Sequence, residues 1–277
     1  MMETIKQRYS VRNYLDKTIE KEKIREIMDF INLNEIGPFG NRVRFEIIDT
    51  TEFDKEELKS LGTYGMIKGG DIYIAGIVKK SENNFEDFGY CMEKVILKLT
   101  QIGLGSCWMG GTFNRSNFAK KINLKDDELL PAVTPIGYIA DKKTFKENLI
   151  RTIIGAKKRK PSQELFFDVN SSTPLDLTTI GEYADILEAV RLGPSASNKQ
   201  PWCVIRDKEG SYHLFLNENE SYNNAIPEIK IQNIDMGIAM CHFELVAKEL
   251  SINGKWIKSK TSIDSGKLIY IATWKVS

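Results

Sequence analysis

The five residues RYSVR, at positions 8–12, carry two guanidinium groups and a hydroxyl at alternate positions. In an extended chain, side chains at alternate positions point to the same face. Arg8, Ser10 and Arg12 would then form a clamp for a phosphate group, because arginine binds phosphate oxygens through paired N–H bonds. A solvated basic segment explains the same residues, since so short a motif is loose. The segment alone leaves both interpretations open.

A second candidate surface is a bare backbone turn at the end of the run GLGSCWMGG, residues 103–111. Gly110 and Gly111 leave their N–H groups free of side-chain cover, so a ligand can approach this turn closely. Residues 106–109 are expected to be extended. The run follows a long helix, because apolar residues recur three or four apart from Phe88 to Ile102. Gly103 then ends the helix, since glycine adopts the left-handed C-terminal turn without strain.

The third candidate is the polar loop GPSASNKQPW, residues 193–202, which follows a helix expected over 177–192. A shorter relative, GPFGN, lies at 37–41. The long helix is also repeated. Asp87-x-Gly89 and Asp235-x-Gly237 each begin an apolar stripe, and a tryptophan follows each aspartate at the same distance, at 108 and at 256. Shared starts, stripes, turns and tryptophans indicate an internal duplication.

The remaining elements can be placed by periodicity and by turn residues. Helices are expected over 2–8, 20–33, 54–61 and 113–122, strands over 44–50, 71–78, 132–140, 203–206, 213–216 and 267–275, and a charged connection over 144–160. The sequence therefore predicts an α+β sheet-and-helix sandwich built from two pseudo-symmetric half-repeats, 1–165 and 166–277. Such halves can pack in one chain as the subunits of a homodimer do.

Composition narrows the function classes. The 277 residues include 39 basic and 38 acidic side chains, for a net charge of +1, which predicts no broad field for nucleic acid or membrane. The four cysteines lie far apart without a CxxC pair, so neither a metal site nor a disulfide framework is indicated. The first residues lack an apolar signal core and no apolar run is long enough to span a bilayer. We therefore expect a cytoplasmic protein.

In combination, these motifs resemble the nitroreductase superfamily of flavin mononucleotide (FMN) enzymes. The resemblance rests on R-x-S-x-R at 8–12, GPSASNKQPW at 193–202, the Asp-x-Gly helix leading to GLGSCWMGG, PIGY at 135–138 and KKRKPSQELF at 157–166. It is closest to the branch in which two halves are fused. Here the first half keeps the arginine motif and the glycine turn, and the second keeps the polar loop. The resemblance thus implies a single FMN per chain, held between the halves.

The resemblance also implies roles for single residues. Arg8, Ser10 and Arg12 would hold the phosphate and ribityl end, with Lys157 and Arg159 adding positive charge. Residues of the polar loop would line the isoalloxazine ring, and these are Pro194, Ser195, Ala196, Ser197 and Asn198. Gly111, with Gly110, would present a backbone N–H to the flavin N5, which is the catalytic contact. Trp108, Trp202 and the two histidines are expected to be structural.

The implied activity is an FMN-dependent NAD(P)H oxidoreductase that reduces nitroaromatic, quinone or similar small acceptors by ping-pong hydride transfer. NAD(P)H would bind transiently, because no dinucleotide-binding GxGxxG motif follows a strand. The chain would act as a monomer, as an intramolecular pseudo-dimer. A non-catalytic FMN-binding protein, a carrier or sensor of the same fold, is the alternative.

Overall fold

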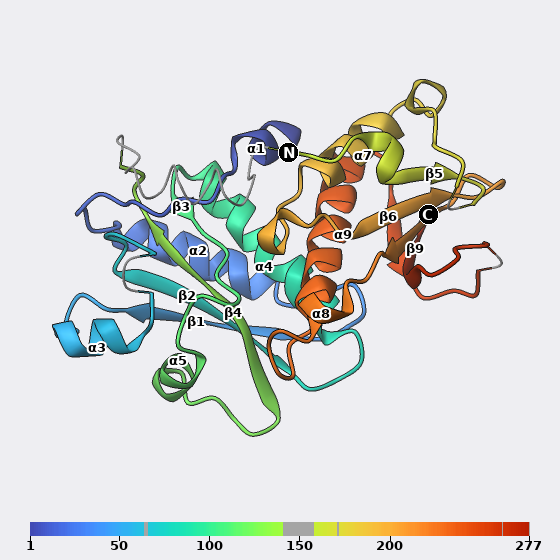
Figure 1. The fold of residues 1–277 in the computed structure, drawn as a ribbon. Coiled ribbons are helices and arrows are strands. Elements are labelled where there is room, and N and C mark those ends of the chain that lie inside the picture. The colour runs from blue at the N-terminus through green and yellow to red at the C-terminus, as the bar shows by residue number, and fades with distance from the viewer. Residues whose placement is uncertain (64–65, 141–157, 171, 262, 277) are drawn as a thin grey trace.

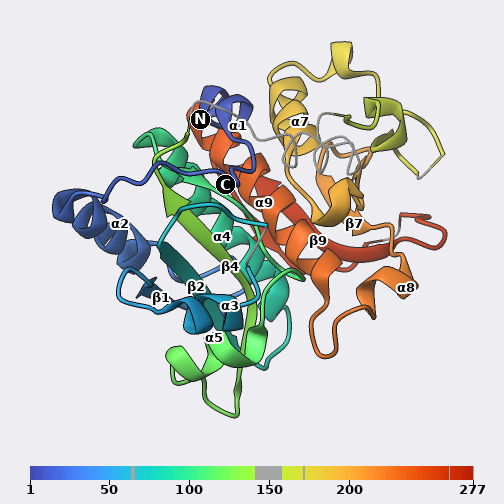
Figure 2. The ribbon, with the colours of Figure 1, turned by 60° about the vertical axis from the view of Figure 1, so that its left-hand side comes forward.

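Two long helices pack against each other between two sheets (Figure 1). The computed structural model describes residues 1–63, 66–140, 158–170, 172–261 and 263–276. The central helices are α4 (Asn84–Gln101) and α9 (Ile231–Glu249), and they stay adjacent when the molecule is turned (Figure 2). The chain is therefore organised around one helix pair, with one helix from each half.

The first sheet has the strand order β1-β2-β4-β3 and is antiparallel throughout. Its strands are β1 (Val43–Asp49), β2 (Ile72–Lys79), β3 (Gly105–Ser106) and β4 (Glu128–Gly137). The second sheet has the order β5-β6-β7-β9-β8, in which only β5 runs parallel to its neighbour. Its strands are β5 (Phe166–Asp168), β6 (Trp202–Arg206), β7 (Tyr212–Leu216), β8 (Gly254–Ile257) and β9 (Ile269–Val276). The predicted α+β class is confirmed.

Shorter helices surround this frame. They are α1 (Met2–Gln7), α2 (Lys21–Leu33), α3 (Lys55–Ser60), α5 (Arg115–Lys121), α7 (Tyr183–Leu192) and α8 (Glu220–Asn223), with single 3₁₀ turns η1 (Ser162–Glu164), η2 (Leu177–Thr179) and η3 (Ala196–Asn198). Helix α1 packs against α4 of the first half and against α7 of the second half, so the N-terminal segment begins between the two halves. No helix among the described residues combines the length and the apolar character needed to cross a membrane.

The two sheets repeat one element order. Apart from the extra strand β5, β1, β2, β3 and β4 occupy the places in the first sheet that β6, β7, β8 and β9 occupy in the second. In each half the long helix follows the second of these strands. This mirrored order is what an internal duplication predicts, and the half boundaries at 165 and 166 stay a prediction.

The crossing of α4 and α9 depends on one glycine from each helix. A Cβ atom built on Gly89 would lie 2.1 Å from the Ile234 carbonyl oxygen, and one built on Gly237 would lie 1.9 Å from the Glu86 carbonyl oxygen. Both distances are far below any contact that atoms can tolerate. Glu86 and Ile234 each stand immediately before an Asp-x-Gly motif, and the backbone of each contacts the glycine of the other helix. Glycine is needed at both positions because the two backbones touch.

Each Asp-x-Gly aspartate is buried and holds the Gly-Pro loop of its own half. Asp87 accepts hydrogen bonds from the Phe39 N–H (2.9 Å), the Asn41 N–H (2.8 Å) and the Asn41 side-chain amide (2.9 Å). Asp235 accepts one, from the Ala196 N–H at 2.9 Å, and its Oδ2 is buried without a partner among the described residues. Burial raises the pKa of both carboxyl groups. The two equivalent carboxylates thus differ in how well they are satisfied.

This difference predicts unequal effects of the same substitution. Asp87→Asn should lower the free energy of unfolding by about 2 kcal/mol. Both carboxylate oxygens of Asp87 accept hydrogen bonds, and the side-chain NH₂ of asparagine would replace one of these acceptors with a donor. Asp235→Asn should cost less than about 1 kcal/mol, since the amide nitrogen can take the place of the unpartnered oxygen. Urea denaturation of the flavin-free proteins measures both values. Equal losses would contradict this assignment of hydrogen bonds.

Several sequence predictions need correction. The helix expected over 177–192 is divided into η2 and α7, because Gly181 between them is left-handed, with φ +56°. The helices α4 and α9 begin before Asp87 and Asp235, respectively, and β4 covers 128–137 where a strand was expected over 132–140. Strands β5 and β8 and helix α8 were not predicted because all three are short. Whether so short a segment forms a strand depends on pairing with residues distant in sequence. Most of the charged connection over 144–160 lies outside the described residues.

Candidate functional site

A cavity of about 500 Å³ lies between the two halves. Every predicted site residue lines it except Lys157, which is outside the described residues. These are Arg8, Ser10, Arg12, Gly110, Gly111, Arg159, Pro194, Ser195, Ala196, Ser197 and Asn198. The structure therefore brings together three motifs that are far apart in the chain, at 8–12, 110–111 and 194–198. A volume of this size is typical of small-molecule sites.

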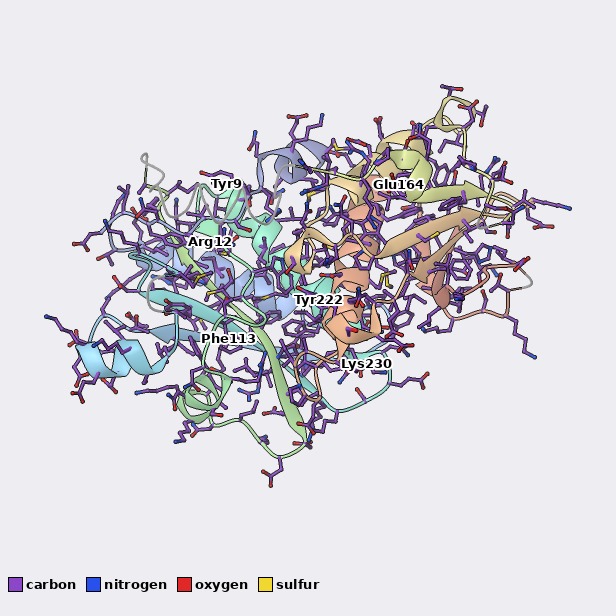
Figure 3. The ribbon with its side chains drawn as sticks, in the orientation of Figure 1. Tyr9, Arg12, Phe113, Glu164, Tyr222 and Lys230 are labelled. Carbon is purple, nitrogen blue, oxygen red and sulfur yellow. The ribbon has the colours of Figure 1, made fainter. Side chains whose placement is uncertain are left out.

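The N-terminal segment reaches the cavity in extended form. Helix α1 ends at Gln7, and the next residue, Arg8, already has extended angles, φ −62° and ψ 128°. The Val11 N–H then donates to the Ser106 carbonyl oxygen at 2.8 Å, and Ser10 pairs with Ser106 as an isolated parallel bridge. Arg8, Ser10 and Arg12 thus line the cavity and Val11 is buried in the protein, while Tyr9, at an intervening position, lines the cavity as well. Tyr9 and Arg12 are labelled in Figure 3.

Arg8 is a buried cation at the cavity wall. Its side chain is only 6% exposed, and its Nε lies 3.8 Å from Glu93 Oε1 without a hydrogen-bond partner among the described residues. Glu93, on α4, is itself fully buried, and its Oε2 accepts a hydrogen bond from the Trp108 indole N–H at 2.7 Å. An arginine in this position has donor capacity left for a ligand in the cavity.

The buried pair Glu93 and His242 connects this arginine to the second half. His242 Nδ1 lies 2.8 Å from the Ala189 carbonyl oxygen and must donate to it, because a carbonyl only accepts. Its Nε2 lies 2.9 Å from Glu93 Oε1, so one proton is shared between the two side chains. Neither His242 nor His213 lines the cavity, which agrees with the structural role expected for both.

Arg159 adds a second guanidinium group to the same wall. Its Nη1 donates to Asn198 Oδ1 and its Nη2 donates to the Leu192 carbonyl oxygen, both at 3.0 Å. Burial, followed by the charges of Arg8 and Arg191, lowers the pKa of Arg159 to about 10. An arginine whose pKa is lowered by neighbouring cations lies in an electrostatic field that suits an anion. A phosphate bound here would relieve that repulsion.

The polar loop over 193–200 is held in an unusual backbone shape. Ser197, Asn198 and Gln200 have left-handed angles, with φ of 46°, 56° and 49°. The Ala196 N–H is fixed by Asp235, and the Gln200 N–H donates to Ser195 Oγ at 2.8 Å. Non-glycine residues in this region are strained, and such strain persists where the surroundings enforce it. The loop therefore presents its side chains to the cavity in one defined arrangement.

The Gly110-Gly111 turn lies under apolar side chains from the second half. A Cβ on Gly110 would lie 3.3 Å from Ile231 Cδ1, and one on Gly111 would lie 3.5 Å from Ile226 Cδ1. Neither glycine N–H donates a hydrogen bond within the described part of the chain. The turn therefore keeps two backbone donors at the cavity, as the bare backbone predicted.

The sequence missed much of the apolar lining. Residues from both halves complete the wall, and these are Tyr9, Met66, Ile67, Cys107, Met109, Thr112, Ala132, Tyr222, Ala225, Ile226, Ile231, Ile234, Asp235 and Ile238. Tyr222, from the unpredicted helix α8, has its hydroxyl 2.6 Å from Ser197 Oγ and lies near the centre of Figure 3. Trp202 is buried as expected, whereas Trp108 also lines the cavity. The isoleucine spacing on α9 was a signal that could have revealed part of this wall.

The residues present fit a flavin nucleotide. The buried Arg8 and the partly buried Arg159 suit a phosphate dianion. The apolar walls suit the faces of an aromatic ring, and free backbone N–H groups suit its heteroatoms. The fit rests on Arg8 Nε and on the two glycine N–H groups, which have no acceptor within the described residues.

Comparison with known proteins finds a family model and solved structures to which the chain is similar. A family model described as "Putative TM nitroreductase" matches residues 1–247. In structure the chain is similar to a protein from Thermotoga maritima described as a putative nitroreductase, with 20% sequence identity and a TM-score of 0.61, over 99% of this chain and 92% of that chain. No protein of curated description matches the sequence.

Weaker structural similarities cover about half of the chain. A nitroreductase family protein from Clostridium difficile 630 is 22% identical, with a TM-score of 0.45, over 59% of this chain and 95% of that chain. An FMN-dependent nitroreductase from Clostridium difficile R20291 is 24% identical, with a TM-score of 0.42, over 52% of this chain and 90% of that chain. At these scores neither similarity adds to the argument.

Proposed function

The chain belongs to the nitroreductase family described by that model, and from this premise we propose that it is an FMN-dependent NAD(P)H oxidoreductase. Its acceptors would be nitroaromatic compounds, quinones or similar small molecules. Bound FMN would supply the two-electron hydride chemistry between NAD(P)H and the acceptor. The observation that carries the proposal is a pair of neighbouring guanidinium groups at the cavity, the buried one of Arg8 and the partly buried one of Arg159.

In this proposal the cavity residues divide the work of binding. Arg8, Ser10, Arg12 and Arg159 would hold the phosphate and ribityl end, together with Lys157. The polar loop, Pro194 to Asn198, would line the ring from the second half. The Gly111 N–H would donate to N5, where the protein's part is to polarise the atom that receives hydride.

The apolar part of the lining suggests how the acceptor binds. Tyr222, Ile226 and Ile231 of the second half and Met66 and Ile67 of the first half are uncharged and line the cavity. Such a wall favours a flat, uncharged molecule over a charged one, because burying an unpaired charge is costly. A hydride acceptor and the nicotinamide ring would use the same space in turn, as a ping-pong reaction requires.

We further propose one FMN per chain, with the single chain as the functional unit in the cytoplasm. The loop equivalent to the polar loop, GPFGN, carries Phe39 in place of the small side chains, and Lys258 Nζ lies 5.0 Å from the centre of the Phe39 ring. Phe39 of this loop thus lies against Lys258, and the loop lacks the Ser-x-Asn element of the polar loop.

Flavin content and anaerobic reduction test the proposal together. The purified protein should be yellow, with one FMN per chain by absorbance against protein mass. NADH or NADPH under nitrogen should bleach the colour, and a quinone or nitro compound should restore it. A yellow protein that neither reductant bleaches would identify the flavin carrier or sensor. Two flavins per chain, or none after incubation with excess FMN, would contradict the proposed site.

A further inference from the structure

Arg115 does not line the cavity, but it is hydrogen-bonded to the Gly110-Gly111 turn, which does. Its Nε donates to the Leu130 carbonyl oxygen at 2.8 Å, and its Nη2 donates to the carbonyl oxygens of Pro131 (3.0 Å) and Gly110 (2.6 Å). Within the described residues it forms no ion pair, and burial lowers its pKa. This partly buried guanidinium group also lies over the Phe113 ring, 4.7 Å from its centre, and has three carbonyl partners in place of a carboxylate, so its placement calls for an explanation.

Part of that explanation is a bulge in the first sheet. The pairing of β2 with β4 passes from Gly76 and Ala132 to Val78 and Leu129. Two residues of β4, Leu130 and Pro131, therefore face one residue of β2, and the ladder is interrupted there. Arg115 satisfies the carbonyl oxygens of both bulge residues. Support of the sheet accounts for two of its three hydrogen bonds.

The third hydrogen bond fixes a peptide group. The Gly110 carbonyl and the Gly111 N–H belong to the same peptide, which is trans, as no cis peptide occurs among the described residues. In a trans peptide the C=O and N–H bonds point in opposite directions within one plane. Holding the oxygen toward Arg115 therefore turns the Gly111 N–H away from Arg115. Gly111 lines the cavity whereas Arg115 does not.

We infer that Arg115 is a positioning residue that aims and polarises the Gly111 N–H toward the flavin N5. The inference rests on the proposed function, because it concerns the same contact. Glycine on both sides of the peptide would let this plane rotate freely, so an external hold is needed. A charged donor on the carbonyl also strengthens the N–H as a donor, since hydrogen bonds through one peptide reinforce each other.

Nuclear magnetic resonance on two labelled samples tests the inference. In flavin-free protein labelled with ¹⁵N-glycine, Arg115→Met should move the Gly111 amide ¹⁵N resonance upfield, because its carbonyl loses a charged donor. In protein loaded with ¹⁵N-FMN, the N5 resonance should move downfield, because N5 loses a hydrogen bond. The rate constant of flavin reduction by NAD(P)H should fall about tenfold, the effect of one hydrogen bond.

Two further variants make the test decisive. Arg44→Met is the matched control, since Arg44 also binds β4, through Glu128, but does not line the cavity or touch the turn. It should leave both resonances unchanged. Arg115→Lys keeps the charge without the fork and should give smaller shifts in the same directions, which decides the matter if Arg115→Met does not fold.

The possible outcomes are distinguishable. A folded, flavin-loaded Arg115→Met protein with wild-type resonances would show that Arg115 only supports the sheet, and would overturn the inference. So would wild-type resonances in Arg115→Lys if Arg115→Met does not fold. Failure of the wild-type chain to bind FMN would instead refute the proposed function, and the Gly111 amide resonance in flavin-free protein would still test the hold by Arg115.

Discussion

Gly237→Ala is expected to lower the free energy of unfolding by at least about 3 kcal/mol, and Gly89→Ala by a similar amount. The added Cβ would lie 1.9 Å from the Glu86 carbonyl oxygen in the first case and 2.1 Å from the Ile234 carbonyl oxygen in the second. Backbone atoms on a helix cannot turn aside as a side chain can. The helices must therefore separate, and with them the two walls of the cavity. Urea denaturation followed by circular dichroism measures the loss.

Gly111→Ala provides the matched control for these substitutions. Its Cβ would meet only Ile226 Cδ1, at 3.5 Å, which is an ordinary contact. We expect its free energy of unfolding to stay within about 0.5 kcal/mol of the wild type. If Gly237→Ala is tolerated as well as Gly111→Ala, the close crossing of α4 and α9 is wrong.

Arg159→Gln is expected to weaken FMN binding about 100-fold, or about 2.7 kcal/mol. Arginine can give a phosphate two charge-assisted hydrogen bonds, whereas glutamine offers one neutral donor. The group is protonated at neutral pH even though its pKa is lowered to about 10. Fluorescence titration of the flavin-free protein with FMN gives the dissociation constant. Riboflavin, which lacks the phosphate, should bind both proteins with nearly equal affinity.

Lys158→Gln is the control, because Lys158 carries the same charge next to Arg159 but is exposed and does not line the cavity. Its effect should be less than threefold, as expected of a screened surface charge. Arg159→Gln also removes a contact to Asn198, so thermal unfolding of the flavin-free variant must be compared. Equal losses for FMN and riboflavin would show that Arg159 acts through the loop and not on the phosphate.

Much of the frame could be predicted because it depends on local patterns. Helical periodicity and a following glycine predicted the core of α4, and a repeated Asp-x-Gly predicted the relation between α4 and α9. The alternation in RYSVR could form a clamp only in an extended chain, and the structure shows that the segment is extended, with a backbone hydrogen bond from the Val11 N–H to the Ser106 carbonyl oxygen. Patterns of this kind are visible in sequence because neighbours in the chain determine them.

What could not be predicted depends on contacts between distant residues. In sequence, an arginine at the start of a short helix, such as Arg115, is expected to be solvated. The structure gives it hydrogen-bond acceptors at the bulge residues Leu130 and Pro131. Pro131 inside a strand was a signal of that bulge. Tyr222 stands in a helix of four residues, Glu220–Asn223, which is too short to show periodicity. Its place at the cavity follows from the packing of α8 on α9.

The cavity wall also has a genetic consequence. Arg8 and Arg12 come from one short stretch, whereas Tyr222, Ile226 and Ile231 of its apolar lining come from a stretch far later in the chain. Mutations in the later stretch can reshape the space offered to an electron acceptor and leave the early arginines untouched. Under the proposed function, descendants of this chain could therefore change the acceptor that they reduce and keep the arginines that hold the FMN phosphate.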